Sequence, residues 1–121
     1  MGRVIHFEIP AEKPERAVKF YQDVFGWKID KWGGGMDYWL ATTGDDKEMG
    51  INGAITTSDS IKCTANTIGV DDLDKVAKKA IAAGAKQTSP RQTIPSIGYF
   101  AYFTDTEGNV FGMLQPNPNA S

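Results

Sequence analysis

The stretch Glu15-Arg-Ala-Val-Lys-Phe-Tyr-Gln-Asp-Val-Phe-Gly-Trp27 decides the fold of the first half of the chain. Pro14, just before it, suits the first turn of an α-helix, and Gly26 is typical of a helix end. Apolar residues recur at three- and four-residue steps, the spacing that places side chains on one helix face. They are Ala17, Val18, Phe20, Tyr21, Val24 and Phe25. Such an apolar face must be covered by a sheet or by another helix.

Strands are predicted on both sides of this helix. The segment Val4–Ile9 alternates apolar and polar residues, which is typical of a half-buried strand. The alternation places His6 and Glu8 on the face opposite the apolar residues that pack under the helix. Three further segments have strand character after the helix, separated by glycine-rich or polar turns. They are Trp27–Trp32, Met36–Ala41 and Met49–Ile55.

The same order recurs after a polar segment, Thr56–Ser60, that is typical of a linker. Cys63–Val70 predicts a strand, and Asp71 or Asp72 is a candidate N-cap for a helix that ends at Gly84. Further strands are expected at Ala85–Thr88, Gly98–Thr104 and Val110–Gln115. Aligning the two helices places His6 on Ala65, and an internal duplication is the simplest explanation. The sequence therefore predicts one α+β domain, residues 1–121, built from two βαβββ modules (1–57 and 61–116).

This arrangement predicts a place for a ligand. Each helix can cover only one face of its own sheet, so the two opposite faces are expected to line a shared trough. A trough of this kind suits a small organic molecule, and an interface between chains is the alternative use. The connection Ser89–Gly98 is long and contains two prolines, so we expect it to arch over an opening of the trough.

Composition limits the remaining possibilities. A chain of 121 residues with 40% hydrophobic residues can bury one core. The net charge is −2 and the basic residues are dispersed, which argues against nucleic acid as a partner. No segment approaches the roughly 18 apolar residues of a membrane span, so we expect a cytoplasmic protein. The single cysteine, Cys63, excludes an intrachain disulfide and is interpreted as a small apolar filler.

The helix stretch resembles the first module of the vicinal oxygen chelate superfamily, which includes glyoxalases, bleomycin-resistance proteins and extradiol dioxygenases. Two segments of the second half resemble the second module: Ile68-Gly-Val-Asp-Asp-Leu-Asp74 and Thr104-Asp-Thr-Glu-Gly-Asn-Val-Phe111. The resemblance implies a glyoxalase-like fold and a homodimer, and it is greatest to small bacterial glyoxalase-related proteins. It implies no particular reaction, because members share a scaffold and differ in chemistry.

The resemblance also implies where a divalent metal would bind: one ligand comes from the first strand and one from the last strand of each module. His6 matches the first of these positions, whereas its counterpart Ala65 and the last-strand residue Gly112 offer no ligand atom. The corresponding strand of module one offers Asn52 or Gly53. We therefore expect no cofactor. A divalent metal bound by His6 with Glu8, Asp37 or Glu48 is the alternative.

Other residues are candidates for binding or catalysis. His6 and Glu8 are the candidate catalytic pair, because a neutral imidazole can move a proton next to a carbonyl group while Glu8 fixes its tautomer. Arg91 could bind a ligand carboxylate. Aromatic rings on or beside the strands could bind a flat ligand: Trp32, Tyr38, Trp39, Tyr99, Phe100 and Tyr102.

Three functions remain open on these grounds. The first is a protein that binds a small organic molecule and has a degraded metal site, with lyase or isomerase chemistry as its reaction class. The second is a sequestering binder of the bleomycin-resistance type. The third is a metal-dependent lyase or dioxygenase that uses His6.

Overall fold

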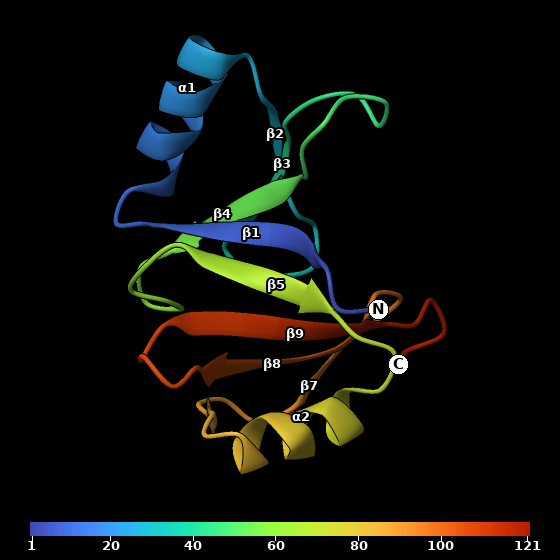
Figure 1. Ribbon diagram of the computed structural model, residues 1–121. Helices are drawn as coiled ribbons and strands as arrows, with labels where there is room; N and C mark the ends of the chain where they lie inside the picture. The colour runs from blue at the N-terminus through green and yellow to red at the C-terminus, as the bar shows by residue number, and fades with distance from the viewer. The chain divides into compact units, whose positions relative to one another are not determined.

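The computed structural model describes residues 1–121 and divides them into two compact units (Figure 1). We call His6–Thr64 the N-terminal unit, and Met1–Ile5 together with Ala65–Ser121 the C-terminal unit. The first five residues therefore group with the second half of the sequence, which periodicity alone does not indicate.

In the N-terminal unit one helix packs on one face of a sheet. Its elements, in chain order, are β1 (Val4–Ala11, which enters this unit at His6), α1 (Pro14–Phe25), β2 (Lys28–Lys31), β3 (Tyr38–Thr42) and β4 (Gly53–Thr57). The strands lie in the order β2-β3-β4-β1; β1 and β4 are parallel, and the other neighbours are antiparallel.

The C-terminal unit repeats this plan. Its elements are β5 (Ala65–Gly69), α2 (Leu73–Ala82), β6 (Lys86–Gln87), β7 (Gln92–Ile94), β8 (Gly98–Thr104) and β9 (Val110–Pro116). The order is β5-β9-β8-β6, with β5 and β9 parallel, and β7 pairs with β8. The predicted α+β class and the duplicated strand-helix-strands plan are confirmed, with β7 as an additional strand in the second half.

Helix α1 has the predicted bounds. Gly26 follows it in the left-handed conformation (φ 72°) and donates its N–H to the Gln22 carbonyl, which caps the last turn. The inner part of the apolar stripe, Ala17, Val18 and Tyr21, packs against a core of strand residues Ile29, Ala41 and Ile55. The outer part, Phe20, Val24 and Phe25, is exposed. Neither α1 nor α2 is long and apolar enough to cross a membrane.

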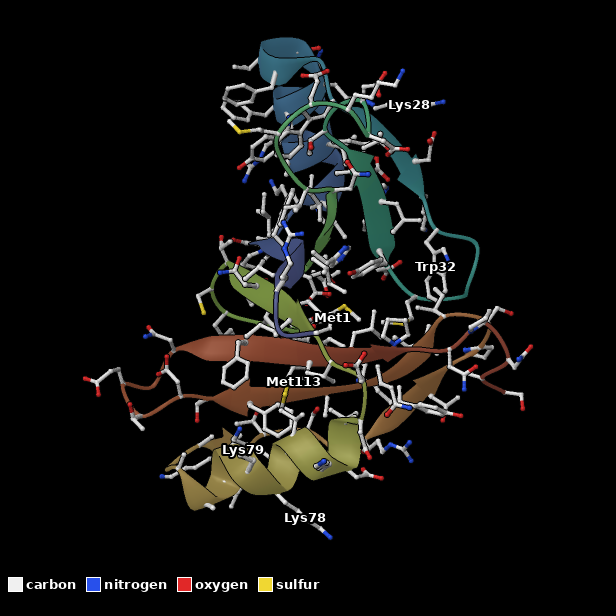
Figure 2. All side chains as sticks on the ribbon, turned by 45° about the vertical axis from the view of Figure 1, so that its right-hand side comes forward. Met1, Lys28, Trp32, Lys78, Lys79 and Met113 are labelled. Carbon is white, nitrogen blue, oxygen red and sulfur yellow. The ribbon has the colours of Figure 1, made fainter.

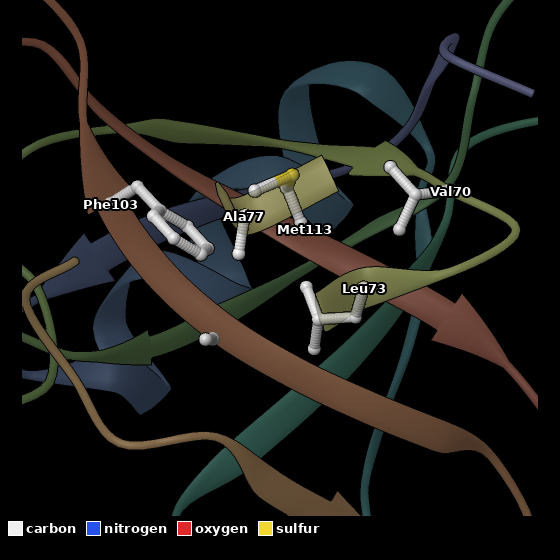
Figure 3. Packing of buried hydrophobic residues seen from close by; sticks show 6 residues of the cluster. Val70, Leu73, Ala77, Phe103 and Met113 are labelled. Carbon is white, nitrogen blue, oxygen red and sulfur yellow. The ribbon is translucent and has the colours of Figure 1, made fainter. Parts of the chain in front are cut away.

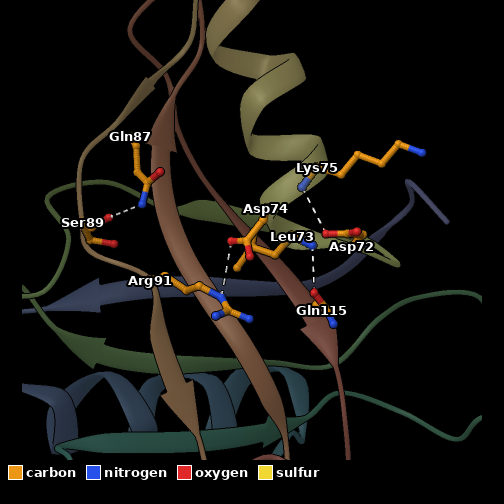
Figure 4. Close-up of polar contacts among 8 residues, drawn as sticks. All are labelled: Asp72, Leu73, Asp74, Lys75, Gln87, Ser89, Arg91 and Gln115. Carbon is orange, nitrogen blue, oxygen red and sulfur yellow. Dashed lines mark hydrogen bonds and ion pairs between the residues drawn. The ribbon is translucent and has the colours of Figure 1, made fainter.

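Asp72, rather than Asp71, caps the N-terminus of α2. Its carboxylate accepts a hydrogen bond from the Lys75 amide at 3.1 Å (Figure 4). The Leu73 amide donates to the side chain of Gln115 on β9 at 2.8 Å, which ties the helix to the sheet. Beneath α2 lies a core of buried residues (Figure 3): Val70, Leu73, Ala77, Ala101, Phe103 and Met113.

The structure corrects the expectation for Ser89–Gly98. This segment is not a loop throughout, because it contains strand β7, which pairs antiparallel with β8 through Gln92–Phe100, Thr93–Tyr99 and Ile94–Gly98. The two prolines lie just outside β7, where they remove no ladder hydrogen bond. A second correction concerns β4, which begins at Gly53 rather than at Met49 and extends into the predicted linker as far as Thr57.

Candidate functional site

His6 and Glu8 lie on the face of the N-terminal sheet opposite α1. Strand alternation requires this, because Phe7 contacts Trp27 and Ile9 packs into the core beneath α1. The register places Glu8 beside Ala54 on β4, and Ala54 beside Leu40 on β3. The predicted face of His6 and Glu8 is therefore confirmed.

Tyr38, at the start of β3, is the hydrogen-bond partner of His6. The Nε2 atom of His6 lies 2.8 Å from the Tyr38 hydroxyl, and the two ring centroids are 6.3 Å apart. From the sequence, Tyr38 is predicted to bind ligand but not to contact His6. That contact depends on the pairing of β3 with β4, which no local sequence signal specifies.

Glu8 gives this site its charge. Only 5% of the residue is exposed. Burial lowers the pKa of His6 below its ordinary value, and the negative charge of Glu8 opposes this shift with a smaller effect. The imidazole is therefore neutral at pH 7. A neutral imidazole has one N–H that can donate and one bare nitrogen that can accept a proton.

Trp32 extends the aromatic part of this site. It lies at the end of β2, where the chain turns toward β3 (Figure 2), and its ring meets Tyr38 edge-on at 6.2 Å. The Trp32 amide donates to the Tyr38 carbonyl at 2.8 Å and closes the turn. The Trp32 ring lies over Gly34, where an added Cβ would approach it to 2.3 Å. The glycine run thus lets the indole fold back over the turn.

Phe100 and Tyr102 lie on the corresponding face of the C-terminal unit. They are on the face of β8 opposite to Ala101 and Phe103, which contact the core beneath α2, and their rings meet edge-on at 4.7 Å. The Phe100 ring fills the space above Gly112, because a Cβ built on Gly112 would lie 2.5 Å from the ring. Gly112 therefore lacks a ligand atom and also has no room for a longer side chain.

Three predicted ligand-binding residues, Trp39, Tyr99 and Arg91, lie on the helix-covered faces of the sheets and so away from the faces on which the trough was expected. Trp39 packs against the core beneath α1, with the Lys31 ammonium 5.3 Å from its ring centroid. Tyr99 packs against the core beneath α2. The Arg91 guanidinium lies 4.3 Å from the Tyr99 ring and 3.6 Å from Asp74 on α2 (Figure 4). We leave these residues out of the candidate site.

The residues at the family's metal positions do not suit a metal. By strand register, Ala54 opposite Glu8 is the counterpart of Gly112 opposite Thr67, so the four positions hold one histidine, two alanines and one glycine. Asn52 instead accepts a hydrogen bond from the Thr43 amide at 2.9 Å. No group of three His, Cys, Asp or Glu side chains is arranged to hold a metal ion. One imidazole is fewer ligands than a catalytic metal requires.

Comparison with known proteins agrees with this fold. The model of the Glyoxalase/Bleomycin resistance protein/Dioxygenase superfamily matches residues 3–113. A glyoxylase-like domain-containing protein of Didymella fabae is 32% identical over 114 residues, which cover 89% of each chain.

The mycobacterial protein CFP32, provisionally named a glyoxylase in Mycobacterium tuberculosis (strain CDC 1551 / Oshkosh), is 31% identical over 97% of this chain. The matched part is 45% of CFP32, so the present chain spans about half the length of that relative. Among solved structures, a methylmalonyl-CoA epimerase of Streptomyces coelicolor has a TM-score of 0.69 at 14% identity, with 98% of this chain and 97% of the epimerase covered. At that identity the similarity shows the fold alone.

Proposed function

Because the chain belongs to the Glyoxalase/Bleomycin resistance protein/Dioxygenase superfamily, we propose that it binds a small organic molecule at the His6 face of the N-terminal unit. We define this face by His6, Glu8, Trp32 and Tyr38. The observation that carries the proposal is the 2.8 Å contact between His6 and Tyr38 beside a buried carboxylate. Polar groups of this kind are costly to bury, and they gather where a ligand must be oriented.

The chemistry that these residues support is proton transfer next to a carbonyl group, as in a lyase or an isomerase. In such a step a C–H proton passes to a base, and the electron pair moves toward the carbonyl oxygen. Glu8 can accept that proton, while the imidazole N–H of His6 beside the oxygen can stabilise its developing charge. This chemistry uses side chains alone and needs none of the metal positions that hold alanine or glycine.

Two classes of carbonyl compound are candidate substrates. Relatives named glyoxylases suggest small oxo compounds and their thiol adducts. Acyl-CoA thioesters are the second class, because a methylmalonyl-CoA epimerase has the same fold. Both classes present the carbonyl oxygen that the His6 face is suited to bind.

A sequestering binder is the second candidate. The observation that favours it is the pair of rings Trp32 and Tyr38, which meet edge-on at 6.2 Å and offer apolar surface to a planar compound. A sequestering protein would hold the compound with no proton transfer. Turnover of the bound compound by wild type, lost in His6→Ala, supports the enzyme, whereas binding to wild type without turnover supports the binder.

The oligomeric state of the chain is a second point. We propose a homodimer, because the mycobacterial relative contains about twice the length of this chain and a second copy would supply the equivalent mass. A cytoplasmic location and the shared trough between modules remain predictions from the sequence. Light scattering of the purified chain tests the dimer directly, and a mass of 13.2 kDa would contradict it.

A thermal-shift screen tests the proposed function. The wild-type protein, treated with a chelator, is screened against small oxo compounds, their thiol adducts and acyl-CoA thioesters. We expect at least one class to raise the melting temperature, and we expect His6→Ala to reduce that shift. Lys79→Ala, which changes an exposed residue of α2, is the matched control and retains the shift. Ligand shifts that appear only after nickel, zinc, iron or manganese is added would contradict the proposal.

A further inference from the structure

The two ring nitrogens of His6 have different surroundings. Nε2 lies 2.8 Å from the Tyr38 hydroxyl. Nδ1 makes no hydrogen bond within the protein. Every fully buried side-chain nitrogen and oxygen in the structure has a partner, so Nδ1 is not fully buried. Nδ1 is therefore the ring nitrogen of His6 whose hydrogen-bonding position is not taken by Tyr38.

The contact with Tyr38 decides which nitrogen of neutral His6 carries the proton. A phenol is a stronger hydrogen-bond donor than a neutral imidazole N–H, and an unprotonated imidazole nitrogen is a good acceptor. The favoured arrangement has the Tyr38 O–H donating to Nε2, which leaves the single ring proton on Nδ1. Burial keeps the ring neutral by lowering the His6 pKa.

We propose that Tyr38 is a positioning residue that fixes His6 as the Nδ1–H tautomer, and that Nδ1–H is the donor that binds the oxygen of an uncharged carbonyl group in the ligand. This inference rests on the proposed function, because it names the ligand class of the same site. Glu8 supplies the preference for an uncharged group. Its carboxylate is buried on the same strand face as His6, and it disfavours a second negative charge nearby.

Nuclear magnetic resonance of the imidazole ring tests the tautomer without any ligand. His6 is the only histidine in the chain, so its two ring nitrogens give unambiguous signals in ¹⁵N-labelled protein. Above the His6 pKa we expect wild type to show protonated Nδ1 and bare Nε2. In Tyr38→Phe we expect the proton to move in large part to Nε2, which is favoured in free imidazole side chains. Tyr99→Phe removes a phenol from the helix-covered face of the other unit and keeps the wild-type tautomer.

Two outcomes overturn the positioning role. One is a wild-type protein with the proton on Nε2, which needs no variant to detect. The other is a Tyr38→Phe protein that folds and keeps the proton on Nδ1. A purely structural role for Tyr38 would change stability without moving the ring proton, so the spectrum separates the two roles.

A matched pair of probes tests the ligand class. Benzamide and benzoate have the same flat ring, and they differ in whether the group beside it is a neutral carbonyl or a carboxylate. We expect benzamide to shift the His6 ring signals and benzoate to bind at least about tenfold more weakly. Equal or tighter binding of benzoate, or no response to either probe at high millimolar concentration, overturns the assignment of Nδ1–H to an uncharged carbonyl group. The tautomer result is independent of the ligand screen, so failure of this inference is distinguishable from failure of the proposed function.

Discussion

The ring of Phe100 on β8 occupies the space above Gly112 on β9, so that a Cβ at Gly112 would lie 2.5 Å from the ring. The family's last-strand metal position is thus filled by an aromatic side chain. Restoring a carboxylate there would require Phe100 to move.

We therefore predict that Gly112→Ala destabilises the fold by about 1–3 kcal/mol through overpacking. The pair Phe100→Ala with Gly112→Ala should lose less than the sum of the two single changes, because the smaller residue leaves room for the new Cβ. Urea unfolding of the four proteins measures this coupling. Additive losses would show that the ring does not constrain position 112.

The burial of His6 predicts how its pKa differs from that of a free histidine. We expect its pKa in the folded protein to lie below the ordinary value of 6.5, because desolvation outweighs the attraction of Glu8. The unfolded chain then binds the proton more readily, so the fold loses stability as the pH falls from about 6.5 to the folded pKa. Below that pKa this loss levels off. Histidine NMR measures the pKa, and His6→Gln should remove this part of the pH dependence of the melting temperature. A folded pKa above 6.5 contradicts the argument.

Replacing Glu8 tests whether its negative charge raises the pKa of His6 against the effect of burial. Glu8→Gln removes the charge that favours the imidazolium ion, so the pKa of His6 should fall further than in wild type. Glu12→Gln, an exposed change just after β1, is the control and should leave the titration unaltered. A rise in the His6 pKa on removal of the Glu8 charge would be inconsistent with the geometry.

The cap of α2 gives a prediction about stability alone. Asp72→Ala should cost about 0.5–2 kcal/mol, because the Lys75 amide loses its acceptor. The neighbouring Asp71→Ala removes an exposed ion pair with the chain's amino group, which is worth about 0–1 kcal/mol. Urea unfolding separates the two variants, and an equal or larger loss at Asp71 would contradict the cap assignment.

Much of the fold is specified by local patterns. The bounds of α1 follow from Pro14, the apolar spacing and Gly26, and β8 follows from the alternation between Gly98 and Thr104. Strand β7 could not be predicted from local patterns, because its three residues lie between two prolines and form a strand only by pairing with β8. Short edge strands of this kind depend on long-range contacts.

The site was predictable in part. Alternation along β1 is sufficient to place His6 and Glu8 together on one face. The same rule, applied to Tyr38 with Trp39 and to Tyr99 with Phe100, separates adjacent rings onto opposite faces, and it would have excluded Trp39 and Tyr99. The contact of His6 with Tyr38 could not be predicted from the sequence, because it depends on the order and register of strands β1, β4 and β3.

The central claim is that the His6 face binds a small carbonyl compound through side chains. The most direct measurement records the ring signals of His6 while oxo compounds and acyl-CoA thioesters are added to chelator-treated protein. We predict saturable shifts of the Nδ1 signal with at least one class of compound, and smaller shifts in Tyr38→Phe. If no compound moves these signals, or if they move only after a divalent metal is added, the account is wrong.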